Sequence, residues 1–174
     1  YLVTGALILF ANLSLDAGVG DIKIRSDFPG GNVTVVKNEP GKVEIEPDLR
    51  GGNPWFYWNF EAEVNQPGSV EFILPDSFKM GAKGPAVSFD DGRTWAWMGT
   101  DNVFFGTQRA DGKKRDSFKY DFRNKAEKIR FAVAIPYLQS EFDDFLKRNA
   151  GNSHISQSVL TKSSKGLPVE LVQV

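Results

Sequence analysis

The side chains best suited to metal or nucleophilic chemistry are scarce in this 174-residue chain, which contains one histidine, His154, and no cysteine. A catalytic zinc site usually needs two or three histidines, and this chain can supply only His154. A serine–histidine–aspartate triad would also depend on His154, which ends the polar stretch from Gly151 that is typical of an exposed loop. The sequence therefore predicts no catalytic residue, no metal ligand and no cofactor on this chain.

One turn carries a known pattern, S-x-D-x-G-x-T-W or Asp box, formed by Ser88, Asp90, Gly92, Thr94 and Trp95. Its chemistry is local, because Asp90 can accept hydrogen bonds from backbone N–H groups of the turn and Gly92 permits a positive φ. In sialidases the pattern repeats from blade to blade of a propeller, whereas here it occurs once in a chain too short for that fold. The pattern therefore predicts a structural hairpin with Trp95 packed beneath it.

Aromatic side chains are concentrated in the segment Trp55–Phe60, which we expect to lie within one long strand. Successive side chains of a strand point to opposite faces, so Trp55 and Tyr57 would share one face and the remaining aromatic side chains the other. A lone sandwich needs only one of these faces for its core. We expect the other face, with Trp97 and Tyr137, to contact a partner domain or to bind a sugar ring.

From residue 21 onward, short runs that alternate apolar and polar residues are separated by turns rich in glycine and proline. About ten such runs, at intervals of roughly eight to twelve residues, are typical of an all-β protein with a two-sheet antiparallel β-sandwich. We expect the aromatic strand to pair with Ser69–Leu74 across the turn Asn65–Gly68.

Only one short helix is predicted, and it lies towards the C-terminus. Ser140 has the character of an N-cap, with Asp143 three residues later as in a capping box. Two phenylalanines and a leucine form one apolar stripe on this helix, which we expect to pack on the sandwich. The final residues predict a terminal hairpin, in which Ser156–Thr161 and Pro168–Val174 are joined by the turn Ser163–Gly166.

The overall charge and the N-terminal segment limit the partners of the chain. A net charge of −1 argues against a dedicated nucleic-acid binder, which normally carries a strongly basic face. The apolar run Ala6–Ala11 is too short for a stable membrane span, which takes about 20 apolar residues. Its length is that of a signal-peptide core. We therefore expect export, to the periplasm or outside the cell, if this segment is a signal-peptide remnant, and a cytoplasmic location otherwise.

The segment Arg109–Arg130 is strongly basic, with nine basic and four acidic residues. Such a segment could attract an acidic partner or substrate tail. A solvated hairpin around the turn Ala110–Lys114 is the simpler interpretation, and it is the one that we favour.

Several features, taken in their order along the chain, resemble the N-terminal β-sandwich domain of zinc carboxypeptidases of the cytosolic carboxypeptidase type, in the carboxypeptidase A-like superfamily. These features are Asp27–Asn32, the aromatic segment Trp55–Phe60, the hairpin Asp90–Trp95, Pro136–Tyr137 before the helix, and Leu160–Val174. Each feature is short, and the resemblance rests on the order in which they follow one another along the chain.

The resemblance implies a parent metallocarboxypeptidase that hydrolyses C-terminal residues of peptides with zinc-activated water. The zinc motif of that family (H-x-x-E with a later histidine), its substrate-binding arginine and its general-base glutamate would belong to a catalytic domain absent from this chain. No catalytic residue is therefore carried over. Zinc, the peptide substrate and the catalytic domain are expected partners of the parent protein.

These inferences divide the chain into three parts: a signal-peptide remnant or N-terminal strand (1–20), a β-sandwich domain (21–150), and a linker with the start of the catalytic domain (151–174). The expected function is that of a non-catalytic accessory domain, which supports the peptidase active site or restricts access to it. The alternative is a carbohydrate-binding module that uses Trp55, Tyr57 or Trp97. A free-standing enzyme is disfavoured by the single histidine.

Overall fold

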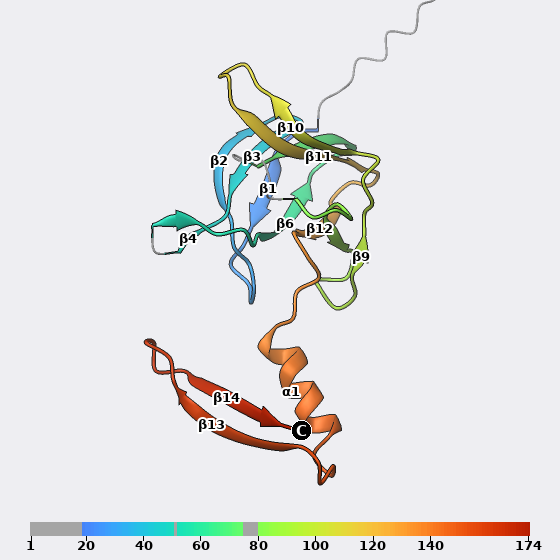
Figure 1. The fold of residues 1–174 in the computed structure, drawn as a ribbon. Helices are drawn as coiled ribbons and strands as arrows, with labels where there is room; N and C mark the ends of the chain where they lie inside the picture. The colour runs from blue at the N-terminus through green and yellow to red at the C-terminus, as the bar shows by residue number, and fades with distance from the viewer. Residues whose placement is uncertain (1–18, 51, 75–79) are drawn as a thin grey trace, which may run out of the picture. The chain divides into compact units, whose positions relative to one another are not determined.

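The computed structural model describes residues 19–50, 52–74 and 80–174 of the chain. The chain divides into two compact units, unit 1 ending at Ile135 and unit 2 spanning Pro136–Val174, and each is described by itself. Their strands and helix can be followed in Figure 1. This division groups the helix with the terminal hairpin, whereas the sequence-based division kept it with the sandwich. The expected signal-peptide remnant lies, up to residue 18, outside the described residues.

The first sheet of unit 1 has the strand order β1-β6-β12-β8-β9, and each neighbouring pair is antiparallel. Its strands are β1 (Ile22–Arg25), β6 (Asn59–Val64), β12 (Lys128–Ala132), β8 (Ala86–Ser88) and β9 (Ala96–Trp97). Phe60 of β6 lies directly opposite Phe131 of β12. Because opposed residues point to the same face, both rings enter the core.

The second sheet has the strand order β10-β11-β7-β3-β2, in which only the β3/β7 pair is parallel. Its strands are β10 (Val103–Gln108), β11 (Lys114–Phe122), β7 (Gly68–Ile73), β3 (Lys42–Glu46) and β2 (Thr34–Glu39). A two-stranded ribbon, β4 (Leu49–Arg50) with β5 (Asn53–Pro54), follows β3. The predicted two-sheet β-sandwich is thus confirmed, with one parallel pair inside the second sheet.

Aromatic side chains from both sheets form the centre of the core of unit 1. Their ring centroids lie 5.0–6.0 Å apart in a fully buried cluster made of Trp58, Phe60, Phe72, Phe118 and Phe131. Rings at this separation contribute about 0.5–1.5 kcal/mol per pair beyond the burial of their apolar area. The rings therefore form the centre of the contact between the two sheets, and buried aliphatic side chains such as Val43, Ile45 and Val64 complete the core.

The expected long aromatic strand is shorter in the structure, and its expected pairing is wrong. β6 begins at Asn59, and the preceding residues 55–58 approach it as irregular chain. β6 pairs with β1 and β12, while β7 pairs with β11 and β3 in the other sheet. The turn Asn65–Gly68 therefore carries the chain from one sheet to the other instead of closing a hairpin. Periodicity identifies strands but not the sheet to which each belongs.

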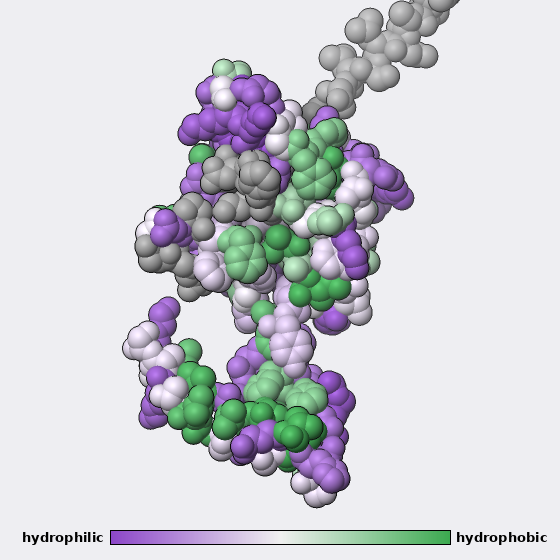
Figure 2. All heavy atoms as spheres, in the orientation of Figure 1, coloured by the Kyte–Doolittle hydropathy of each residue, from purple (hydrophilic) through white to green (hydrophobic). Residues whose placement is uncertain are grey.

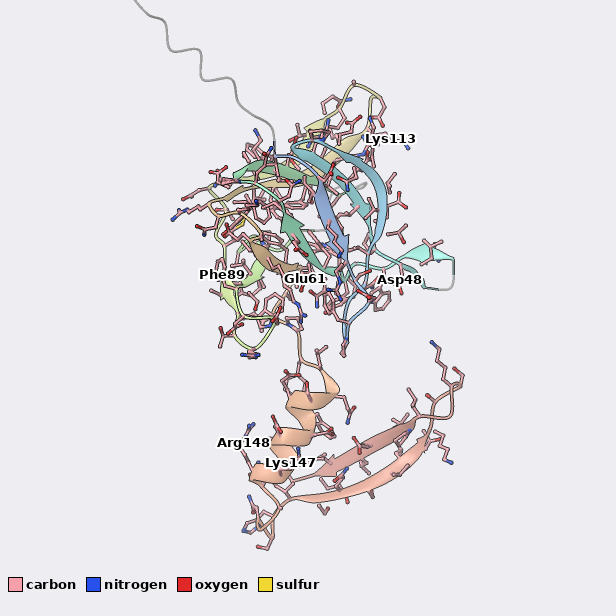
Figure 3. The ribbon with its side chains drawn as sticks, turned by 180° about the vertical axis from the view of Figure 1, so that it is seen from behind. Asp48, Glu61, Phe89, Lys113, Lys147 and Arg148 are labelled. Carbon is pink, nitrogen blue, oxygen red and sulfur yellow. The ribbon has the colours of Figure 1, made fainter. Side chains whose placement is uncertain are left out.

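Unit 2 consists of α1 (Gln139–Arg148) followed by the hairpin β13 (Ser156–Lys162) and β14 (Pro168–Gln173), so the predicted terminal hairpin is confirmed. The predicted N-cap is wrong, because the helix begins two residues earlier, with Leu138 at the cap position. The backbone N–H of Leu138 donates to the Glu141 carboxylate at 2.8 Å. Lys147 and Arg148 lie at the other end of α1, where positive charge is favourable (Figure 3).

Candidate functional site

Two of the sequence-predicted candidates, Trp55 and Tyr57, lie on the irregular approach to β6. The ring of Trp55 packs against that of Phe56 with centroids 5.0 Å apart and planes tilted by 39°, and both side chains are exposed. Tyr57 is half-buried: its hydroxyl accepts a hydrogen bond from Asn59, and its backbone carbonyl accepts one from the Asn32 amide at 3.1 Å. Burial raises the pKa of Tyr57, against the opposing effect of the Asn59 hydrogen bond.

The other two candidates lie in different places. Trp97 of β9 is exposed at the edge of the first sheet, and the Lys83 amine lies 5.4 Å from its ring centroid. Tyr137 belongs to unit 2 and is 67% exposed. Within the described residues no ring contact joins Trp55 or Tyr57 to Trp97. In unit 1, Trp55 and Tyr57 therefore lie on one segment of the chain and Trp97 on a separate strand.

The turn between β8 and β9 is closed by its own side chains. The Asp90 carboxylate accepts hydrogen bonds from the Thr94 hydroxyl at 2.7 Å and the Thr94 backbone N–H at 2.8 Å. These bonds lower the pKa of Asp90 to about 2. Gly92 has φ +86°, and the Trp95 indole N–H donates to its carbonyl at 3.0 Å. These hydrogen bonds all lie within the turn and stabilise its local structure.

Arg130 ties this turn to the rest of the first sheet. Its guanidinium lies 3.3 Å from the Glu61 carboxylate, donates to the Asp91 carbonyl, and stacks over the Phe28 ring at 4.1 Å. Glu61 is a buried carboxylate, seen in the interior of unit 1 in Figure 3, and Arg25 lies 3.6 Å from its second oxygen. Breaking a buried pair leaves an uncompensated charge, so this cluster stabilises the loop arrangement rather than offering a free ligand group.

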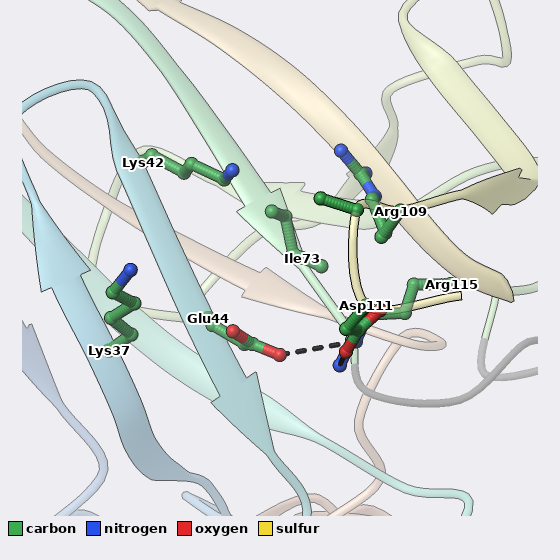
Figure 4. Close-up of a pocket in the computed structure, with 8 residues that line it drawn as sticks. Lys37, Lys42, Glu44, Ile73, Arg109, Asp111 and Arg115 are labelled. Carbon is green, nitrogen blue, oxygen red and sulfur yellow. Dashed lines mark hydrogen bonds and ion pairs between the residues drawn. The ribbon is translucent and has the colours of Figure 1, made fainter. Parts of the chain in front are cut away.

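A second charged cluster lies on the outer face of the second sheet, around a cavity of about 190 Å³ (Figure 4). Arg109 donates to the Glu71 carboxylate at 2.7 Å and to the Ser117 hydroxyl at 2.8 Å. Burial of Glu71 opposes its ionisation, but the hydrogen bonds from Arg109 and Ser117 outweigh it and lower its pKa. Lys37 and Lys42 line the opposite side of the same cavity.

Sequence reasoning identified only half of this cluster. For the basic segment Arg109–Arg130 a solvated hairpin is the favoured interpretation and a surface for acidic groups the alternative, and no pattern singles out Lys37 or Lys42. The structure brings these lysines to the cavity because β3 pairs with β7, which in turn pairs with β11. No local pattern in the sequence predicts that pairing.

A resident zinc ion does not fit the side chains in the part of the chain that the structure describes. Among the residues that the structure describes, no three histidine, cysteine, aspartate or glutamate side chains are placed to share a metal ion. The single histidine, His154, is exposed in the loop before β13. In the same part of the chain, no helix combines the length and apolarity that crossing a membrane requires.

Unit 2 exposes most of its apolar side chains. None of the α1 side chains is fully buried, and Phe142, Phe145 and Leu146 are only half-buried. Figure 2 shows apolar surface along the helix and hairpin of this unit. The exposed apolar residues of the hairpin and its turn are Val159, Leu160, Leu167, Val169 and Val174. An exposed apolar surface of this kind is typical of surfaces that interact with other molecules.

Comparisons with known proteins show that the fold of this chain is similar to part of several solved structures. No family model matches the chain, and no curated protein matches it by sequence. Among solved structures, a metallo-carboxypeptidase from Burkholderia cenocepacia aligns with a TM-score of 0.64 and 17% identity, over 87% of this chain and 38% of that one. A putative carboxypeptidase A from Shewanella denitrificans aligns with a TM-score of 0.65 and 19% identity, over 86% of this chain and 39% of that one.

A third solved structure is similar to the same degree. It is a metallo-carboxypeptidase from Pseudomonas aeruginosa in complex with (2-guanidinoethylmercapto)succinic acid, with a TM-score of 0.62 and 22% identity, over 86% of this chain and 39% of that one. The chain thus spans less than two fifths of the length of each of these proteins. Its fold is that of a part of metallo-carboxypeptidases, as the resemblance in the sequence implied.

Proposed function

We propose that this chain is the N-terminal part of a zinc metallocarboxypeptidase of the cytosolic carboxypeptidase type. Unit 1 would be a non-catalytic accessory domain, and unit 2 would be the first helix and hairpin of the catalytic domain. The main support for the proposal is that 86–87% of this chain aligns with only 38–39% of the length of each carboxypeptidase. The remaining length of such an enzyme would hold the zinc ligands and the peptide substrate.

The exposed apolar surface of unit 2 supports the same proposal. A single two-stranded hairpin is marginally stable in water, and its open edges pair readily with other strands. Further strands of a catalytic domain would cover Leu160 and Val169 and continue the sheet. The half-buried stripe of α1 would gain a complete set of neighbours in the same way.

The exposed and half-buried aromatic side chains at the surface would contact the part of the longer protein that follows this chain. We assign this role to Trp55, Tyr57 and Trp97 of unit 1 and to Tyr137 of unit 2, because aromatic side chains are enriched in protein interfaces. Contacts of this kind would support the peptidase active site or restrict access to it. The glycan-binding alternative stays a prediction.

The coding sequence that follows Val174 gives the first test. An H-x-x-E motif within a few tens of residues is expected there, and the longer chain that includes it should bind zinc and release C-terminal residues from peptides. The 174-residue chain should do neither. A downstream sequence without that motif, or peptidase activity in the 174-residue chain alone, would contradict the proposal.

The interface is tested by Trp55→Ser in the longer chain, with Phe89→Ser as the matched control. Phe89 is also a highly exposed aromatic residue of unit 1, but it lies in the turn after β8 (Figure 3). Trp55→Ser should lower peptidase activity or weaken the association of separately expressed domains, and Phe89→Ser should leave both unchanged. Equal effects of the two substitutions would remove Trp55 from the interface. Loss of binding to an immobilised polysaccharide in Trp55→Ser would favour the glycan alternative.

A further inference from the structure

We propose that Asn32 is a positioning residue that holds Trp55 and Phe56 together as one exposed two-ring surface. This surface would contact the part of the longer protein that follows the chain, and in that respect the inference rests on the proposed function. The positioning itself rests on hydrogen bonds within unit 1 and can be tested in the 174-residue chain. Asp48, one of the residues that Asn32 bonds, is labelled in Figure 3.

The two rings pack against each other in a way that a regular strand does not allow. Successive side chains of a strand point to opposite faces, so an extension of β6 towards its N-terminus would separate Trp55 from Phe56. In the structure their ring centroids are 5.0 Å apart, and the two side chains are 42% and 59% exposed. Residues 55–58 belong to no strand. The irregular backbone at this place therefore creates the two-ring surface.

One side chain holds this segment on both sides of the rings. The Nδ2 of Asn32 donates to the Tyr57 carbonyl at 3.1 Å, and its Oδ1 accepts from the Asp48 backbone N–H at 2.8 Å. The Asp48 carbonyl in turn accepts from the backbone N–H of Trp55 at 3.0 Å. Trp55 and Phe56 thus follow one point of the chain that Asn32 fixes and precede another.

Asn32 is itself held in place. Its backbone N–H donates to the Asn59 carbonyl at the start of β6, at 2.8 Å, and the residue is only 9% exposed. Immediately before it, a Cβ on Gly31 would lie 2.1 Å from the Ser26 carbonyl oxygen, so only glycine fits this close approach. Hydrogen bonds in a partly buried place are stronger than those in water, so Asn32 can transmit this rigidity to residues 55–57.

Both side-chain bonds depend on the amide group of asparagine. The amide carries an oxygen acceptor and an NH₂ donor on a short side chain. Aspartate would keep the bond from Asp48 and lose the donor to Tyr57, and alanine would lose both. Without these bonds the two rings would have to be ordered when the contact forms, at a cost in conformational entropy. A surface that is ordered beforehand avoids this cost.

NMR spectroscopy of the 174-residue chain tests the positioning. In the natural chain, nuclear Overhauser effects should connect the rings of Trp55 and Phe56. Asn32→Ala should remove these effects while the backbone amides of β12 stay protected, and Asn32→Asp should weaken them. The matched control is Asn38→Ala, because the Asn38 side chain also donates to a backbone carbonyl, that of Ile22 at 2.7 Å, and should leave the ring contact unchanged.

A measurement on the natural chain decides the matter if neither Asn32 variant folds. The side-chain NH₂ of Asn32 should exchange with solvent more slowly than that of Asn152, which is exposed. Equal exchange of the two NH₂ groups would overturn the positioning role. So would ring-to-ring effects that persist in both Asn32 variants, or that are lost equally in Asn38→Ala. Each of these results would leave the proposed function untouched.

Hydroxyl-radical footprinting followed by mass spectrometry tests the contact in the longer chain. Trp55 and Phe56 should be modified more slowly there than in the 174-residue chain. Asn32→Ala should weaken the contact by about fivefold to thirtyfold, the cost of fixing the backbone of one residue, so this protection should fall. Equal modification of the natural 174-residue chain and the natural longer chain would overturn the contact, whereas the NMR result judges the positioning by itself.

Discussion

Units 1 and 2 are both built from strands with alternating or apolar sequence, yet only unit 1 encloses its apolar side chains. In unit 1, Phe60 and Phe131 of one sheet meet Phe72 and Phe118 of the other, and all four are fully buried or nearly so. In unit 2 none of the described side chains is buried. Two sheets can cover each other, whereas one helix and one hairpin leave faces open. The difference shows that two facing sheets bury their apolar side chains, whereas the helix and hairpin of unit 2 do not bury theirs by themselves.

Hydrogen exchange should give the largest contrast between the units. Backbone amides of β6 and β12 should exchange only on global unfolding of unit 1, while those of Leu171 and Val172 in β14 open locally. With a global stability of about 5 kcal/mol or more, the amides of β6 should be protected at least a thousandfold better than those of β14. The measurement is exchange followed by NMR on a dilute monomer. Equally slow exchange at Leu171 and at β6 would show that the hairpin belongs to the core of unit 1.

Truncation of one side chain in each unit sharpens the same comparison. Phe60→Ala removes a fully buried ring and should cost about 3–5 kcal/mol of the free energy of unfolding. Leu171→Ala acts on a half-buried side chain and should cost less than about 1 kcal/mol. Urea unfolding followed by tryptophan fluorescence measures unit 1 directly, because all four tryptophans lie before Ile135.

A milder variant keeps this measurement possible if Phe60→Ala prevents folding. Phe60→Leu removes less volume, and its cost should lie between those of the two alanine variants. A larger loss for Leu171→Ala than for Phe60→Leu in the fluorescence transition would mean that unit 2 contributes to the core reported by the tryptophans. That result would break the distinction between a closed and an open unit.

The smallest effects should be local titrations that do not depend on a closed core. The hydrogen bonds from Thr94 lower the pKa of Asp90 to about 2, and the hydrogen bond from Ser140 is the largest cause of the lowered pKa of Glu141. Each folded pKa lies below the unfolded value. The ionised carboxylates therefore stabilise the turn and the helix N-terminus at pH values above about 4, and this contribution is lost as the pH falls through the folded pKa.

An NMR titration checks these two groups separately. The Thr94 amide should titrate near pH 2 in the natural chain and should not titrate in Asp90→Asn. The Leu138 amide should follow Glu141 in the same way, because the Glu141 carboxylate accepts its hydrogen bond. Loss of the Glu141 titration shift in unit 2, with the Asp90 shift kept in unit 1, would mean that even local structure in unit 2 requires a partner.

The sequence determined the features that depend on neighbouring residues. Alternation predicted most strands, the glycine at position 92 predicted the positive φ of its turn, and the turn Ser163–Gly166 predicted the terminal hairpin. These features follow from backbone sterics and short-range hydrogen bonds, which a few adjacent residues specify. The single histidine and the lack of cysteine likewise limited the chemistry of the chain before any fold was known.

Only the tertiary structure decided which strands share a sheet and which side chains meet. The turn Asn65–Gly68 crosses between sheets because β6 gains two antiparallel neighbours in the first sheet and β7 gains two neighbours in the second. The parallel contact of β3 with β7 brings Lys42 to the same cavity as Arg109, more than sixty residues away along the chain. Such contacts are selected by the burial of rings across the whole sandwich, which is a property of the assembled sheets and not of any short stretch of sequence.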